Sequence, residues 1–126
     1  MKRNLWLTMT IYAAASLLHF AHNALFVRDY PNLPAWITPL GIMLSWCAIA
    51  AIGATGYWLY RKVSQPAGLT LIAAYALLGF GGLDHYAVAP MRAHSPAMNA
   101  TIAVEVLAAV ALLISVGHAA TVRSRD

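Results

Sequence analysis

Four long apolar stretches constrain this chain more than any other feature of its sequence. They cover about residues 5–27, 36–60, 67–89 and 96–119. Each is longer than the roughly 20 residues that a helix needs to cross a bilayer. We therefore expect an all-α fold: a single domain, 1–126, that forms an integral membrane bundle of four transmembrane helices.

The composition agrees with a lipid environment. Apolar residues make up 61% of the 126 residues and charged residues only 10%, whereas a soluble domain has about a quarter charged residues. The net charge of +4 lies at the ends of the apolar stretches, which favours a role in membrane topology over nucleic acid as a partner. The single cysteine, Cys47, excludes an intrachain disulfide.

The breaks between the stretches carry turn residues. They read RDYPNLPAW, RKVSQP and APMRAHSP. Ser95 can cap a helix whose first turn holds Pro96, and Pro66 and Pro39 suit the first turns of the third and second helices. Loops this short make neighbouring helices antiparallel. Because four helices with short loops make a small bundle, a homodimer is kept as an alternative to a monomer.

Positive residues predict the orientation. Six lie on one side of the expected bundle: Lys2, Arg3, Arg61, Lys62, Arg123 and Arg125. Only Arg28 and Arg92 lie on the other side. Because cytoplasmic loops carry the excess of Lys and Arg, we expect a multi-pass protein of the bacterial inner (plasma) membrane with both termini cytoplasmic (N-in/C-in).

The first stretch has an alternative interpretation as a secretory signal peptide. Met-Lys-Arg precedes an apolar run, as it does in such peptides. The apolar run is longer than a signal core, so we expect a retained helix.

Ionisable and amide side chains converge in the outer half of the expected bundle. At a rise of 1.5 Å per residue, His19 and His22 lie roughly 21 and 26 Å from the inner surface. Asp84 and His85 of the third helix reach the same depth, and Glu105 of the fourth lies near the midplane. His94 and Asn99 stand near the outer mouth. A polar stripe on the first helix, formed by Thr8, Tyr12, Ser16, His19, His22 and Asn23, must face the bundle interior or a water-filled cavity.

The first functional hypothesis is a metal-supported membrane enzyme that acts on membrane lipid or a small hydrophobic molecule. Imidazole and carboxylate ligands suit a divalent metal ion such as Zn or Fe. The expected metal ligands are His19, His22, His85 and Glu105. The expected catalytic residues are Glu105, His19 and Asp84. Asn23, Asn99, Tyr12 and His94 would orient them. Asp84 and His85 are adjacent, so only one of them is expected to face the site.

Three alternatives use the same residues. Without metal, Glu105 as acid and His19 or His22 as base could isomerise, cyclise or hydrate an apolar substrate; the composition resembles the intramembrane His/Glu/Asn cavity of emopamil-binding sterol isomerases. In a haem b electron carrier, His22 and His85 would be the axial ligands. The last alternative is a metal or ion transport protein.

Two short motifs complete the sequence pattern. HFAHN in the first stretch and DHY in the third give the chain a pattern that resembles small bacterial four-span membrane proteins, a likeness that implies no particular activity.

The sequence also contains a faint internal repeat, because a shift of 63 residues matches Tyr12 to Tyr75 and His22 to His85. If it reflects a duplication, these pairs would face each other across the bundle.

Overall fold

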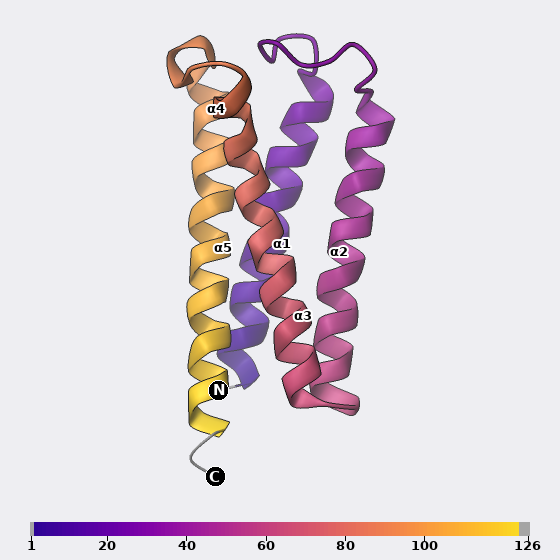
Figure 1. Cartoon of the computed structure of the whole chain (residues 1–126), viewed down its shortest axis with the longest axis vertical. Coiled ribbons are helices and arrows are strands. Elements are labelled where there is room, and N and C mark those ends of the chain that lie inside the picture. The colour runs from indigo at the N-terminus through magenta and orange to yellow at the C-terminus, as the bar shows by residue number, and fades with distance from the viewer. Residues whose placement is uncertain (1, 124–126) are drawn as a thin grey trace.

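The computed structural model describes residues 2–123, and all regular structure among them is helical. The helices are α1 (Lys2–Leu25), α2 (Pro39–Lys62), α3 (Gln65–Leu78), η1 (Gly79–Asp84), α4 (His85–Val88), η2 (Met91–Ala93) and α5 (Pro96–Arg123). Figure 1 shows α1, α2, the α3–η1–α4 rod and α5 side by side. The start of α1, the α2–α3 loop and the end of α5 lie at one end of the molecule. The prediction of an all-α protein is confirmed.

Local chemistry explains where the helices begin. Thr38 has extended backbone angles, and its side chain accepts a hydrogen bond from the Gly41 N–H at 3.1 Å. Because a residue before proline disfavours helical angles, α2 starts at Pro39 and not at the predicted residue 36. Ser95 accepts from the Met98 N–H at 3.2 Å and caps α5 as the sequence indicates.

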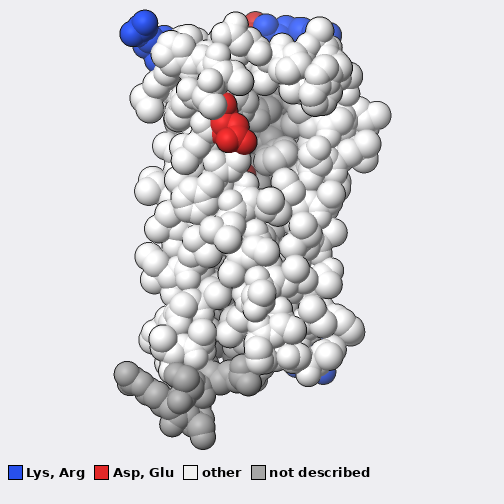
Figure 2. All heavy atoms as spheres, in the orientation of Figure 1, with Lys and Arg blue, Asp and Glu red and all other residues white. Residues whose placement is uncertain are grey.

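Membrane-spanning character is clear for much of the chain. Within residues 2–123, three helices are long and apolar enough to cross a bilayer: Pro39–Lys62, Gln65–Val88 and Pro96–Val122. Helix α1 has 24 residues but is not among these three, and it carries His19, His22 and Asn23 near its end. In Figure 2 the Lys and Arg side chains lie at the two ends of the molecule and the flank in view is largely uncharged. These features are those of a membrane protein.

Tyrosines and small residues pack the centre of the bundle. Tyr12 is fully buried, its ring lies 4.7 Å from that of Tyr75, and its hydroxyl donates to the Tyr75 carbonyl oxygen at 3.2 Å. Gly79 leaves room for this ring, since a Cβ there would lie 2.6 Å from Tyr12 Cε2. The polar residues lie directly against this closely packed layer, which we call the floor of the site.

The third helical segment, α3–η1–α4, changes from α-helical to 3₁₀ geometry beside the polar residues. Three of the six residues of η1 are glycines (GFGGLD), and glycine weakens an α-helix. A 3₁₀ segment turns 120° per residue instead of 100°. Over six residues the difference is roughly 120°, so η1 sets which of the following side chains face α1 and α5.

Candidate functional site

The centre of the site is a buried imidazole–carboxyl pair. His19 of α1 and Glu105 of α5 are each 2% exposed, and His19 Nε2 lies 3.7 Å from Glu105 Oε2. Oε2 has no hydrogen-bond partner among the described residues. Gly82 of η1 lies against both groups, since a Cβ there would be 3.2 Å from Oε2 and 3.6 Å from Nε2. At 3.7 Å the pair is not hydrogen-bonded, but a proton added to either group would allow a bond after a small approach.

Thr101 determines which nitrogen of His19 carries hydrogen. Its hydroxyl donates to the Met98 carbonyl oxygen at 3.0 Å, and its oxygen lies 3.3 Å from His19 Nδ1. Because the hydroxyl hydrogen is already used, Nδ1–H must be the donor to Thr101. A neutral imidazole then has a bare Nε2, and this lone pair is directed toward Asn23.

Asn23 connects His19 to His85. Its amide nitrogen lies 3.0 Å from His19 Nε2 and 3.3 Å from His85 Nε2. An amide NH₂ has two hydrogens, so it can donate one to each imidazole. The two histidine rings are 5.5 Å apart. Three helical rods therefore bring His19, Asn23, His85 and Glu105 into one connected cluster.

A second polar layer covers this cluster. Tyr30, in the loop after α1, is buried; its hydroxyl lies 2.9 Å from His22 Nδ1, and its ring lies 4.8 Å from that of His85. Burial raises the pKa of Tyr30 to about 12, so the phenol is neutral at ordinary pH. His94 Nδ1 donates to the Pro90 carbonyl oxygen at 3.2 Å, which leaves its buried Nε2 without a partner among the described residues.

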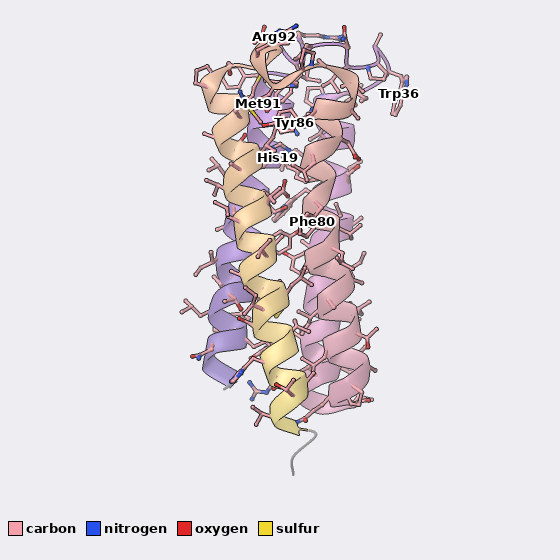
Figure 3. The ribbon with its side chains drawn as sticks, turned by 60° about the vertical axis from the view of Figure 1, so that its left-hand side comes forward. His19, Trp36, Phe80, Tyr86, Met91 and Arg92 are labelled. Atoms are coloured by element: carbon pink, nitrogen blue, oxygen red, sulfur yellow. The ribbon has the colours of Figure 1, made fainter. Side chains whose placement is uncertain are left out.

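Asn99 holds the outer edge of this layer. Its side-chain oxygen accepts from the Tyr86 hydroxyl at 2.8 Å, and its amide donates to the Met91 and His94 carbonyl oxygens at 3.2 and 3.3 Å. Figure 3 shows His19 within the bundle beneath these loops, whereas Trp36 projects from the outer edge.

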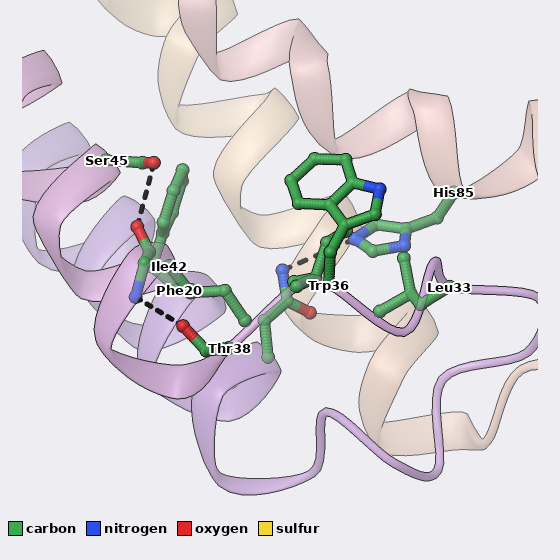
Figure 4. A pocket seen from close by; sticks show the side chains of 10 residues that line it. Phe20, Leu33, Trp36, Thr38, Ile42, Ser45 and His85 are labelled. Atoms are coloured by element: carbon green, nitrogen blue, oxygen red, sulfur yellow. Dashed lines mark hydrogen bonds between the residues drawn. The ribbon is translucent and has the colours of Figure 1, made fainter.

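A cavity of about 350 Å³ reaches the cluster from the side. Most of its wall is apolar, and Asn23 and His85 supply polar groups (Figure 4). Its lining includes Phe20, Asn23, Leu33, Trp36, Ile42 and His85. The two hydroxyl side chains of the wall, Thr38 and Ser45, bond to the backbone of Gly41. Because both N–H groups of Asn23 are directed at the two imidazoles, a ligand would find its polar contacts mainly at His85 and at the indole N–H of Trp36.

The structure separates the predicted site residues into groups. His19, Glu105, His85 and Asn23 come together, and His22, His94 and Asn99 belong to the covering layer. Tyr12 bonds to the backbone of α3 in the floor. Asp84 is exposed, so the structure places it outside the buried cluster, and His85 is the member of the adjacent pair that faces inward.

The predicted metal ligands do not form one coordination group. Among residues 2–123, no set of three or more His, Cys, Asp and Glu side chains lies close enough to hold an ion together. The Asn23 amide occupies the space between the two Nε2 atoms of His19 and His85, and His22 is paired with Tyr30. A metal at this site stays a prediction.

Some functional residues have no signal in the sequence pattern. Tyr30 belongs to a loop, and periodicity does not place loop residues. Phe20 and Trp36 have the pattern of membrane-facing aromatics, yet both line the cavity. Thr101 is the exception that helical spacing could find, because it lies one helical turn before Glu105 on the same face of α5.

Comparisons with protein-family models, with curated proteins and with solved structures give no match to this chain. Its function is therefore inferred from the geometry of the chain itself.

Proposed function

We propose that this chain is a four-span protein of the bacterial inner membrane with both termini cytoplasmic. Three helices have the apolar length for a span, and α1 lies beside α2 and α5 with its polar residues turned inward. The start of α1 and the end of α5 lie at the end of the molecule that also carries Arg61 and Lys62 (Figure 1). The excess of positive residues at this end supports a cytoplasmic location for it.

We propose further that the chain is a membrane enzyme that transfers protons to and from a small hydrophobic molecule. The observation that carries this proposal is the lateral cavity, whose wall includes Asn23 and His85. These two residues connect the cavity to the His19–Glu105 pair. Concave, mostly apolar sites with a few convergent polar groups are where small ligands bind.

The four residues of the cluster would have separate roles. His85 lines the cavity, so its Nδ1–H group would give a proton to one atom of the substrate, and Nδ1 would then take a proton back from another. Asn23 would hold the His85 and His19 rings in fixed orientations through its two N–H groups. Behind this layer, Glu105 would pass a proton to His19 and take it back, which compensates for the change of charge at His85. Removal of a proton from one carbon and its return to another gives an isomerisation without any other reactant.

Exchange of hydrogen with solvent tests this proposal and does not require an identified substrate. The purified protein in lipid nanodiscs is incubated in deuterated water with a total lipid extract of the expressing cells. We expect one lipid-soluble compound to gain carbon-bound deuterium, as measured by mass spectrometry. His85→Phe should slow this gain about a hundredfold or more, which is the usual contribution of acid–base catalysis.

His118→Phe is the matched control, because His118 is an exposed residue of α5 outside the site. It should exchange at the wild-type rate. The absence of any protein-dependent deuterium gain, or equal rates for the His85 and His118 variants, would contradict the proposed chemistry.

A metal-supported reaction is the second candidate. The observation in its favour is the buried Oε2 atom of Glu105, which has no partner among the described residues and lies 3.7 Å from His19 Nε2. Carboxylate and imidazole are suitable ligands for Zn or Fe. For His85 to join them, the Asn23 amide would have to rotate out of the space between the two rings.

Elemental analysis of protein purified without chelators tests this candidate. Stoichiometric metal that both His19→Ala and Glu105→Ala lose, and that His118→Ala retains, would support it. Protein that exchanges deuterium at the full rate without stoichiometric metal would rule it out.

We do not propose the haem b carrier, because Tyr30 contacts both His22 and His85 and a haem between them would have to displace it.

A further inference from the structure

Two cavities lie along the seam between α1 and α2. The outer cavity is the one that reaches Asn23 and His85. The second cavity, of about 290 Å³, lies nearer the start of α1 and is lined almost entirely by apolar groups. Its wall includes Ala13 of α1 and Trp46, Ala50 and Ala54 of α2.

The two cavities belong to one surface. On α2, Ser45 lines the outer cavity and its neighbour Trp46 lines the second. On α1, residues 13, 17 and 20 share one face at 100° per residue, and they span about 10 Å. Leu17, between the cavity residues Ala13 and Phe20, is 38% exposed. The partly exposed apolar side chain of Leu17 therefore lies between the two cavities.

The first half of helix α2, which borders both cavities, is not buried in the bundle. Its buried residues are Gly53, Gly56 and Tyr60, all in the half next to α3. From Pro39 to Ile52 none of its residues is buried. Figure 1 shows α2 and α3 together at their loop and apart at the other end.

His85 gives the outer cavity a hydrogen-bond donor. Its Nε2 accepts from the Asn23 amide, so a neutral ring carries its hydrogen on Nδ1. Among the described residues Nδ1 has no hydrogen-bond partner, and His85 is only partly buried. A ligand in this cavity would thus meet an N–H group that needs an acceptor such as a carbonyl oxygen.

We propose that the α1–α2 seam binds a prenylated quinone-type compound, a flat oxygenated ring with a long hydrocarbon tail. The ring occupies the outer cavity beside the aromatic side chains of Phe20 and Trp36, and a ring carbonyl accepts from His85 Nδ1–H. The tail runs past Leu17 into the second cavity. This inference rests on the proposed function, since it names the substrate class of that site, but binding is measured without turnover.

Three probes separate the contributions of ring and tail. Phylloquinone has both, menadione has the ring without the tail, and squalene is hydrocarbon alone. Each probe is equilibrated between nanodiscs with and without the protein, the discs are separated by the affinity tag, and bound probe is measured by mass spectrometry. We expect phylloquinone to be enriched in the protein-bearing discs at least tenfold more than either partial probe.

Two variants test the two ends of the seam. His85→Phe should lower the enrichment of phylloquinone and menadione about tenfold, the effect of one lost hydrogen bond, and leave squalene unchanged. Ala54→Phe should fill the second cavity from its rim and lower the enrichment of phylloquinone and squalene but not of menadione. Ala51→Phe, at an exposed alanine of α2 outside both cavities, should change none of them.

Equal enrichment of phylloquinone in protein-bearing and empty discs would overturn the proposal. So would equal enrichment in wild type and both variants when circular dichroism shows that all are folded. The variant Glu105→Gln distinguishes a failure of the seam-binding proposal from a failure of the proposed proton-transfer reaction. It should slow deuterium exchange about a hundredfold or more and retain phylloquinone binding, whereas loss of seam binding with intact exchange would point to a different substrate class.

Discussion

Gly68→Ala is expected to weaken the bundle more than any other single methyl group added to the chain. A Cβ at Gly68 of α3 would overlap the backbone N and Cα atoms of Tyr60 in α2. Backbone atoms in a helix cannot rotate away as a side chain can, so the two helices must separate. Overpacking costs about 1–3 kcal/mol when side chains can adjust, and we expect the upper part of this range or more.

Thermal unfolding in detergent, followed by circular dichroism, measures this effect. Gly117→Ala of α5 is the matched control, because a Cβ there meets no atom within 4 Å. An alanine in an open helical position gains up to about 1 kcal/mol over glycine, so this variant should melt at or above the wild-type temperature. If both variants melt together, the backbones of α2 and α3 are not in close contact at Gly68.

The ends of the helices could be predicted approximately because their causes are local. Ser95 and Pro96 mark the start of α5 within a few residues of sequence. The apolar stretch placed the start of α2 at residue 36, whereas the helix begins at Pro39 after the Thr38 cap. The convergence of His19 and Glu105 was also predictable, since depth along a helix follows from a rise of 1.5 Å per residue. An estimate of a residue's depth in the bundle requires only its residue number and the direction of its helix.

Side-chain direction in the third rod could not be predicted in the same way. A continuous helix over 67–89 is the natural expectation from its apolar residues, but the 3₁₀ winding of η1 turns the residues that follow it. This turn directs His85 toward Asn23 and leaves Asp84 exposed. Three glycines in GFGG were the visible signal, although glycine pairs of this kind also occur in regular transmembrane helices for close packing.

The covering layer depends on a loop, and loops have no periodicity to read. Tyr30 bonds to His22 and packs on His85 only because the segment after α1 folds back over the cluster. This fold-back changes the interpretation of His22. The sequence pattern favours it as a metal ligand beside His19, and the structure uses one of its ring nitrogens to hold Tyr30.

Glu105→Gln is expected to have the largest effect on the proposed reaction. Glutamine has nearly the same shape, so the buried position 3.7 Å from His19 Nε2 can be filled without a cavity. It cannot accept and return a proton as a carboxyl group does. Deuterium exchange into the substrate should fall by a factor of about a hundred to ten thousand, while the melting temperature stays near that of the wild type.

A double-variant cycle shows whether Glu105 and His19 act as one unit. The effects of substituting groups that share one function are not additive, so the double variant His19→Ala/Glu105→Gln should exchange about as slowly as the slower single variant.

Thr101→Val removes the partner that orients His19 and leaves the carboxyl group in place. It should reduce exchange less than Glu105→Gln does, because it affects the orientation of the base and not the proton carrier itself. Wild-type exchange in Glu105→Gln would instead assign the buried carboxyl group to packing and move the chemistry to His85 alone.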